Sequence, residues 1–399
     1  MHASDAAAER PVTRDPRLWA LALGNFAMGT GAMMIAGLLP LLADDLKVSV
    51  PAAGQSVTAF AVAVALGGPL LAGPTSRIGR RRLMTFALGL FVAANLLGAL
   101  APDYWTFLAS RVMAGLGNCL FTPHASGVAA HMVSPERRGR AISLVFIGFT
   151  MASVLGVPLG MMTGALLGWR LALVAVAIVA TIALVVLWRA LPGDVRTPPV
   201  DVAGWLEIRR SPALLTIVGV NALQILGQMM TFSYIAPLVD EAAGIDGRTL
   251  GLYMAAFGVA GVVGNIVCGR LIDRIGPAHT GHLSMATMVA AFLGWFAAGA
   301  EGAVAAALLF VVWGLGAFAI NTAQQTRLFS AAPALAGASL PLNTAAIYVG
   351  QAGGAALGGL VVRTLGVGVL PVGSLACIVA ALVVSILSVR GAAARRAAD

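Results

Sequence analysis

One apolar stretch, Tyr104 to Met132, carries polar residues at a spacing that could recognise a solute. Its members are Arg111, Gly115, Asn118 and Thr122, at steps of four, three and four residues. At about 100° per residue these steps place all four on one narrow face of a helix. A guanidinium stays protonated at any working pH, so Arg111 could attract an anionic group but could not itself carry a proton.

Two histidines in the same stretch are candidate proton carriers, because imidazole titrates near neutral pH. His124 and His131 are seven residues apart and therefore share a face. His124 follows Arg111 by 13 residues (124 − 111), which turns it about 220° away from the face of the arginine. We interpret both histidines as structural or interface-facing.

Three further apolar stretches carry amide, hydroxyl and aromatic side chains at helical spacing. The predicted substrate-binding residues are Arg111, Asn118, Thr122, Asn221, Gln224, Gln228, Trp313, Asn321, Tyr348 and Gln351. Nearby methionines (Met28, Met33, Met229 and Met230) would add a pliable apolar lining suited to an amphipathic molecule. The alternative for each polar residue is a hydrogen bond that merely holds two helices together.

The composition determines the class of protein. Hydrophobic residues make up 59% of the chain and charged residues 10%, which excludes a soluble globular protein and predicts an integral membrane protein. The net charge of +9 does not indicate nucleic-acid binding, because the basic residues, nearly all Arg, lie in loops between apolar runs. The three Cys residues all lie inside apolar stretches, so no disulfide framework is expected.

Twelve apolar stretches are long enough to cross a bilayer core of about 30 Å. They are Leu18–Ala43, Ala53–Gly73, Leu83–Leu100, Tyr104–Met132, Ala141–Gly164, Leu171–Leu191, Ala213–Val239, Thr249–Ile272, His282–Ala300, Ala303–Thr326, Ala338–Val362 and Val367–Val389. We predict an all-α protein with an arm (1–17), a six-helix bundle (18–191), a linker (192–212), a second six-helix bundle (213–389) and a tail (390–399).

The two predicted bundles are copies of one unit. Arg77-Ile-Gly79 recurs as Arg274-Ile-Gly276 at an offset of 197 residues (276 − 79). The same offset relates Pro40 to Pro237, Gly54 to Gly251, Phe60 to Phe257 and Gly67 to Gly264. The repeat of Pro40 argues against a cleaved signal peptide. Duplicated halves of this length are typical of secondary transporters, in which a central cavity between two pseudo-symmetric bundles is exposed to each side in turn.

The repeated loop also resembles a known signature. Gly269-Arg-Leu-Ile-Asp273-Arg274-Ile-Gly276 resembles the loop motif of the major facilitator superfamily, and its wider context resembles the twelve-span drug/proton antiporter branch. The first copy keeps Arg77, Gly79, Arg80 and Arg81 but has Ala72 and Ser76 where the family has glycine and aspartate. The resemblance implies a latch between helices on the cytoplasmic side. The alternative is a purely topogenic role for the arginines.

Glycine ridges mark where helices approach closely. Gly156, Gly160 and Gly164 follow four-residue steps, as do Gly350, Gly354 and Gly358, and we expect both ridges to be sliding or rocking surfaces between helices. Gly156-Val-Pro158-Leu-Gly160 resembles the antiporter motif of arabinose-like and chloramphenicol-like exporters, which implies a seal on the outward route. The predicted gating residues are Arg77, Gly79, Arg80, Arg81, Gly156, Pro158, Gly160, Asp273, Arg274 and Gly276.

Arg111, with Gly115 and Gly117 after it, resembles the fourth-span motif of the same family, which is linked there to proton transfer. The alternative is that Arg111 extends to the outer membrane interface, since it lies only about 10 Å along the helix from the start of its span.

The distribution of basic residues predicts the orientation. With the amino terminus inside, Lys47, Arg170, Arg248 and Arg363 lie outside and Arg111 lies in the membrane. The other 20 of the 25 basic residues (25 − 4 − 1) then lie inside, as the positive-inside rule requires. We predict a multi-pass protein of the bacterial cytoplasmic (inner) membrane with both termini and the linker in the cytoplasm.

The predicted function is export of small amphipathic or anionic molecules, such as drugs or metabolites, by alternating access. Proton antiport is implied by the resemblance but opposed by the residues, because all 16 acidic residues lie outside the spans or at their rims. The alternative is an uncoupled facilitator or uptake carrier. An enzyme is not expected, since no nucleotide-binding loop or metal motif is present. No cofactor is predicted beyond a proton gradient, and the partners are a small-molecule substrate and the bilayer, with no nucleic acid and a monomeric chain.

Overall fold

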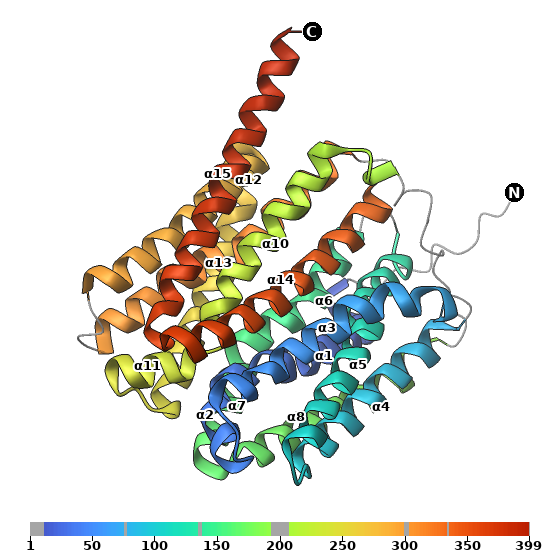
Figure 1. Ribbon diagram of the computed structural model, residues 1–399. Helices are drawn as coiled ribbons and strands as arrows, with labels where there is room; N and C mark the ends of the chain where they lie inside the picture. Colours follow the sequence, from blue (N-terminus) through green and yellow to red (C-terminus); the bar gives the residue numbers. More distant parts are fainter. Residues whose placement is uncertain are drawn as a thin grey trace, which may run out of the picture.

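The computed structural model describes residues 12–75, 78–134, 138–192, 207–298, 303–332 and 335–398. Within these ranges every regular element is a helix (Figure 1). The first half of the chain contains α1 (Pro16–Met33), α2 (Ile35–Asp45), α3 (Val50–Thr75), α4 (Arg80–Ala99), α5 (Tyr104–His131), α6 (Arg138–Met151), a π-helical segment (Ala152–Gly156), α7 (Val157–Leu167) and α8 (Trp169–Ala190). The second half contains α10 (Pro212–Phe232), α11 (Ile235–Ala243), α12 (Gly247–Ala298), α13 (Ala303–Ala331), α14 (Ala336–Leu365) and α15 (Leu370–Ala398).

The helix lengths are consistent with twelve membrane crossings. In the described part of the chain, 9 helices are long and apolar enough to span a bilayer, and α1 with α2, bent by 48°, adds a broken span. The 52 residues of α12 form two arms, because the chain reverses at Gly276, whose φ of 81° is readily reached only without a side chain. Helix α5 has 28 residues, which is about 42 Å at the usual rise per residue. It is not among these 9 helices because Arg111 and two histidines make it less apolar than they are.

Two spans are broken near the repeated prolines. α10 ends just before Ser233 and Tyr234, and α11 carries Pro237, which has no N–H to bond the carbonyl of Ser233. The corresponding break between α1 and α2 lies at Met34, with Pro40 in α2. A third irregularity precedes Pro158, where the N–H of Val157 bonds the carbonyl of Ala152, five residues back.

The internal repeat persists in local structure. Ser49 and Asp246, which are 197 residues apart (246 − 49), occupy equivalent positions before α3 and α12. The Ser49 hydroxyl accepts from the N–H of Ala52 at 3.3 Å, and the Asp246 carboxylate accepts from the N–H of Thr249 at 2.8 Å. Each side chain thereby satisfies one of the free N–H groups at a helix start.

Glycine contacts repeat in the same way. A Cβ on Gly115 of α5 would lie 2.5 Å from the carbonyl oxygen of Phe60, and a Cβ on Gly314 of α13 would lie 2.3 Å from that of Phe257. In both halves, therefore, a glycine lets this helix touch the backbone of the helix that carries the repeated phenylalanine. These contacts establish two related bundles.

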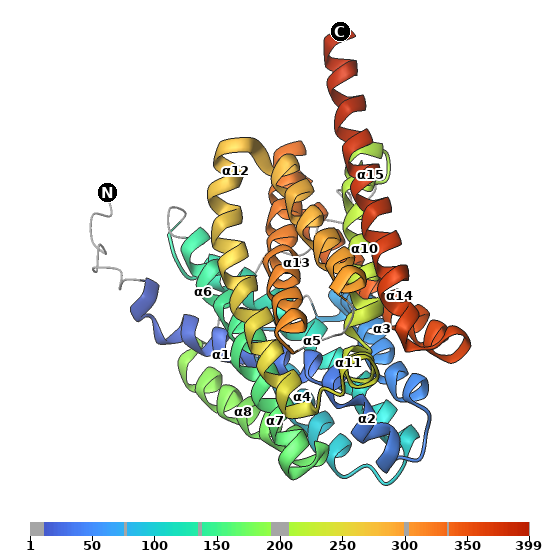
Figure 2. The same cartoon turned by 90° about the vertical axis from the view of Figure 1, so that its left-hand side faces the viewer.

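The two halves meet at the end of the molecule that carries α2 and α11. Helix α3 packs against α14, the π-helical segment and α7 pack against α12, and α2 packs against α11. The start of α1 and the end of α15 lie on the other side of the molecule (Figures 1 and 2). Tyr234 is fully buried in this contact, with its hydroxyl against Gly54 of α3 and Gly359 of α14.

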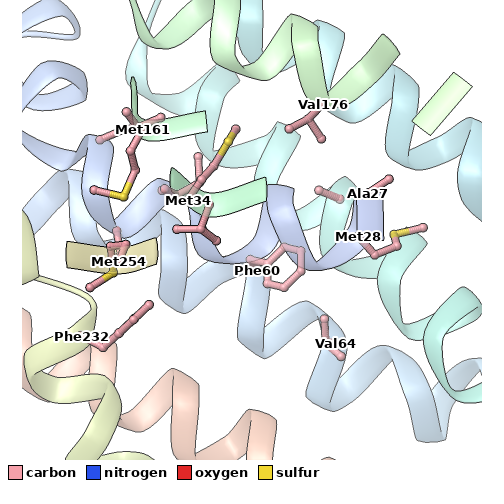
Figure 3. Packing of buried hydrophobic residues seen from close by; sticks show 14 of the residues in the cluster. Ala27, Met28, Met34, Phe60, Val64, Met161, Val176, Phe232 and Met254 are labelled. Atoms are coloured by element: carbon pink, nitrogen blue, oxygen red, sulfur yellow. The ribbon is translucent and has the colours of Figure 1, made fainter. Parts of the chain in front are cut away.

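One hydrophobic cluster runs through both halves. Figure 3 shows Met34, Phe60 and Met161 of the first half in the same cluster as Phe232 and Met254 of the second. Methionine side chains are flexible and polarisable, so this packing can adapt when the halves move relative to one another.

Candidate functional site

Arg111 is the most deeply buried charge in the described residues. Only 2% of it is exposed, and its Nη2 donates to the carbonyl oxygen of Gly31 in α1 at 2.9 Å. The guanidinium also lies over the ring of Phe60, 5.1 Å from its centroid. Gly31 and Phe60 hold the guanidinium inside the first half, whereas the alternative considered from sequence has it extended toward the outer membrane interface.

The contacts of helix α5 fix the position of the Arg111 side chain. Asp103 caps its start by accepting from the N–H of Thr106 at 2.9 Å. Gly115 and Gly117 bring the helix against the backbones of α3 and α4. The Nε of Arg111 has no hydrogen-bond partner among the described residues. A buried, charged donor without a partner is costly, so an anionic ligand that reached this atom after a rearrangement would gain a strong hydrogen bond.

Asn118 and Tyr348 join the two halves. The Tyr348 hydroxyl of α14 donates to Oδ1 of Asn118 in α5 at 3.0 Å. Thr122, one turn further along α5, is half-buried, and its hydroxyl has no partner. Gln351 lies three residues beyond Tyr348 and is also half-buried. The structure therefore brings the polar face of the fourth predicted span together with that of the eleventh.

The polar residues of the seventh predicted span lie inside the second half. Gln224 Nε2 donates to Oε1 of Gln228 at 3.0 Å and lies 3.6 Å from the sulfur of Met288 in α12. Asn221 Nδ2 donates to Oδ1 of Asn343 in α14 at 2.9 Å. All of these amides are buried, so a ligand between the halves would reach them only after a rearrangement. The Asn221–Asn343 bond joins two helices, as in the alternative to substrate binding that we considered.

Asn343 was missed by the sequence analysis. It is 1% exposed, and its Nδ2 has no partner, as is also true of Oδ1 of Asn221 and Oε1 of Gln224. The available signal was its position in the eleventh predicted span, because an amide within a span is costly unless it is bonded.

Trp313 of the tenth predicted span lies in an aromatic cluster. Its ring packs within 6.2 Å, centroid to centroid, of Phe232, Phe257, Phe292 and Phe310. Phe292, Phe310 and Trp313 line a pocket of about 20 Å³ inside the second half, which has room for about one water molecule. Asn321, two turns along α13, is half-buried, and its Oδ1 has no partner.

The two halves differ at the position of Arg111. The glycine pairs Gly115/Gly314 and Gly117/Gly316 set an offset of 199 residues (314 − 115) between α5 and α13. Position 111 then corresponds to Phe310, which is also buried. The first half thus places a charge where the second half places an aromatic ring.

The predicted gating residues lie in different regions of the structure. Gly156 and Gly160 pack on Thr30 and Met34, and the carbonyl of Pro158 faces Gly251 of α12. The eleventh-span ridge, Gly350, Gly354 and Gly358, packs on the backbone of α10. We expected both glycine ridges to be surfaces on which helices slide or rock. In the observed conformation each ridge is the face on which a bent span packs against a neighbouring helix of the same half.

The loop motifs lie at the end opposite to α2 and α11. Arg77 falls outside the described residues, and Gly79 is the N-cap residue of α4. Arg80 is buried, and Arg81 lies over the ring of Trp188 at 4.2 Å. In the second copy Asp273 and Arg274 are exposed, and Gly276 forms the reversal of α12.

The acidic residues in the described part of the chain offer no buried proton carrier. All of them are exposed except Asp15, which pairs with Arg17 at 2.6 Å beside the start of α1. His131 is exposed, and His124 is half-buried with no partner for its Nδ1. Among the described residues no group of His, Cys, Asp and Glu could hold a metal ion.

Comparison with known proteins gives a consistent result. Residues 21–359 match the family described as the Major Facilitator Superfamily. The inner membrane transport protein YdhP of Escherichia coli (strain K12) is 32% identical over 357 residues, which cover 89% of this chain and 91% of YdhP. A chloramphenicol resistance protein of Streptomyces lividans is 34% identical over 348 residues, 84% of this chain and 86% of that protein. A probable sugar efflux transporter of Helicobacter pylori (strain G27) is 26% identical and covers 88% of this chain and 90% of its own.

Solved structures share the fold. A bacterial homologue of the human lysosomal transporter Spinster, in an inward-facing and occupied conformation, superposes with a TM-score of 0.75 at 18% identity. The superposition covers 94% of this chain and 96% of that protein.

Proposed function

The chain belongs to the major facilitator superfamily, a family of membrane transporters, and from this premise we propose that it exports small amphipathic or anionic molecules by alternating access. The observation that carries the proposal is the site around Arg111. A buried guanidinium with a free Nε lies on the same helix face as Asn118, which bonds the opposite half through Tyr348. A solute with a negative or strongly polar group beside an apolar body would match this charge and the methionine and phenylalanine side chains around it.

The contacts between the halves support alternating access. They are concentrated at the α2 and α11 end, where Tyr234 fills the space between Gly54 and Gly359. If the termini are cytoplasmic, this is a conformation closed toward the outside. Rotation of the halves that opened this end would break the Tyr348–Asn118 bond or stretch it, and would expose Arg111 to the other side.

The proposed direction of transport and the proposed location in the cell are taken from the names of relatives. Some are named for resistance to chloramphenicol or for sugar efflux, and YdhP is named an inner membrane protein. We assign this chain to the bacterial inner membrane, with a small molecule as its substrate and a single chain as the working unit.

A second candidate is an uncoupled facilitator or uptake carrier on the same fold. It is favoured by one observation: no described acidic residue is buried within a span. Proton antiport needs a group that alternately binds a proton and responds to the substrate, and buried carboxylates are the usual choice.

Transport into inverted membrane vesicles tests these proposals. Labelled chloramphenicol and a panel of anionic dyes are supplied with a proton gradient, with and without a protonophore. Proton-coupled export gives accumulation against the substrate gradient that the protonophore abolishes. Equilibration that ignores the protonophore identifies the facilitator, and no movement of any compound in the panel above that in empty vesicles rejects export of this substrate class.

A further inference from the structure

A cationic cluster lies in the second half, far from the site around Arg111, where α12 reverses and α13 and α15 approach it. Arg327 of α13 donates from Nη1 to the Ser385 hydroxyl at 2.7 Å and from Nη2 to the Ser388 hydroxyl at 3.0 Å. Nε2 of His282 lies 3.0 Å from the same Ser385 oxygen. The ring of His279 lies 6.0 Å from that of His282, centroid to centroid. Three helices thus direct hydrogen-bonding groups to one place.

Among the residues that the structure describes, Arg327 has no acidic partner. The ion pairs within the described residues join Asp15 to Arg17, Asp44 to Lys47 and Asp45 to Arg170. The nearest acid along α12, Asp273, is exposed. A half-buried guanidinium bonded only to neutral hydroxyls keeps an uncompensated charge, which is unfavourable in an apolar bundle.

The chemistry of the cluster matches a phosphate group. Arg327 retains N–H donors that the two serines do not use, since a guanidinium carries five. The serine hydroxyls can turn to donate, and the imidazole rings of His279 and His282 add further N–H groups. Hydrogen bonds from a cation to phosphate oxygens are the strong, charge-assisted kind.

The surroundings indicate which molecule carries the phosphate. Exposed apolar side chains flank the cluster on the same three helices: Leu283 is 47%, Phe329 53% and Leu387 60% exposed. In a membrane these surfaces face acyl chains, so the cluster lies at the border between lipid tails and headgroups. Arg390, exposed two residues beyond Ser388 on α15, adds positive charge on the side of the carboxyl terminus. Basic pockets of this kind between helices recognise anionic lipid headgroups.

We propose that Arg327, Ser385, Ser388 and His282 form a binding site for the phosphate of an anionic phospholipid, separate from the transport site. The lipid would tie α13 to α15 and to the second arm of α12, and would stabilise the second half. This proposal does not depend on the direction of transport or on the substrate.

The test measures lipid binding to the purified full-length protein. Native mass spectrometry and thermal unfolding in nanodiscs compare phosphatidylglycerol with phosphatidylcholine, and a parallel titration uses inorganic phosphate alone. The variants are Arg327→Gln, the double variant Ser385→Ala/Ser388→Ala and the control Arg189→Gln. Arg189 is an exposed arginine in the last turn of α8, so its replacement removes one positive charge without touching the cluster.

We expect phosphatidylglycerol to bind and to raise the unfolding temperature of the wild type and of Arg189→Gln. Arg327→Gln should weaken binding about fivefold, the contribution of one arginine near an anionic surface. The serine double variant keeps the charge of Arg327 and should also bind the lipid more weakly. It tests the site even if the Arg327→Gln protein does not fold. Binding of inorganic phosphate without any preference for phosphatidylglycerol would overturn the lipid assignment. If phosphatidylglycerol has the same effect on the wild type and on all three variants, or has no effect on any of them, the proposed site is wrong.

Discussion

At the scale of the residue, Arg111 distinguishes the two halves of an otherwise duplicated molecule. The duplicated position in the second half holds Phe310, and both side chains are buried. A charged donor in one bundle and an aromatic ring in the other give a ligand between them one polar and one apolar end to contact. This asymmetry fits the amphipathic substrates that we propose.

Replacing Arg111 with Gln tests that role. The neutral amide removes the attraction for an anionic group and loses the charge-assisted bond to Gly31, which costs about 1.5–3 kcal/mol of stability. We expect transport of anionic substrates in vesicles to fall at least about tenfold, while neutral substrates are affected less. Arg363→Gln, an exposed arginine in the last turn of α14, is the control and should transport as the wild type does. Equal loss for charged and neutral substrates would contradict an electrostatic role.

Tyr348→Phe removes a single hydroxyl from the contact between the halves. Only the bond to Asn118 is lost, and a net hydrogen bond of about 1 kcal/mol corresponds to about a fivefold change in an equilibrium. We expect the ratio of closed to open molecules at the α2 and α11 end to fall by that factor. Spin labels at Lys47 and Arg248, exposed residues at that end in opposite halves, report the change as a longer distance component. An unchanged distance distribution would show that the bond does not bias the conformations.

At the scale of the element, close approach is set by individual glycines rather than by whole ridges. The crossing of α12 with the π-helical segment depends on Gly258, where a Cβ would lie 2.7 Å from the carbonyl oxygen of Ser153 and 2.8 Å from Cα of Val154. Backbone atoms cannot turn aside as a side chain can, so this contact holds the two halves together in the observed conformation.

Gly258→Ala should therefore shift the molecule away from this conformation. The added methyl group forces α12 and the π-helical segment apart, and the same pair of spin labels should report a larger separation. Gly269→Ala is the matched control on the same helix, because a Cβ there meets nothing within 4 Å. The control should leave the distances unchanged, and a shift of similar size in both variants would contradict the assignment of Gly258 as the contact point.

At the scale of the whole molecule, the orientation in the membrane is the main untested prediction. Single cysteines at Lys47 and Arg363 should react with a membrane-impermeant maleimide in intact cells, whereas cysteines at Arg189 and Arg390 should react only after the cells are opened. The three native cysteines are replaced first. The reverse pattern would place the termini outside, and the observed conformation, which is closed at the α2 and α11 end, would then be closed toward the cytoplasm.

The sequence alone determined the class of protein, the repeat and the family. Twelve apolar stretches follow from composition, because a bilayer accepts only apolar segments about 20 residues long, and a duplicated sequence requires duplicated helices. The polar face of α5 was also predictable, since helical periodicity places Arg111, Asn118 and Thr122 together once the helix is known.

Only the tertiary structure decided which faces meet. Periodicity says that Asn221, Gln224 and Gln228 share a face, but it does not say whether that face points between the halves or into its own bundle, and here it points into the bundle. The same limit explains the glycine ridges, which pack inside each half. The rotation of a helix about its axis depends on the shapes of all its neighbours, and these contacts join residues more than a hundred positions apart, such as Asn118 and Tyr348.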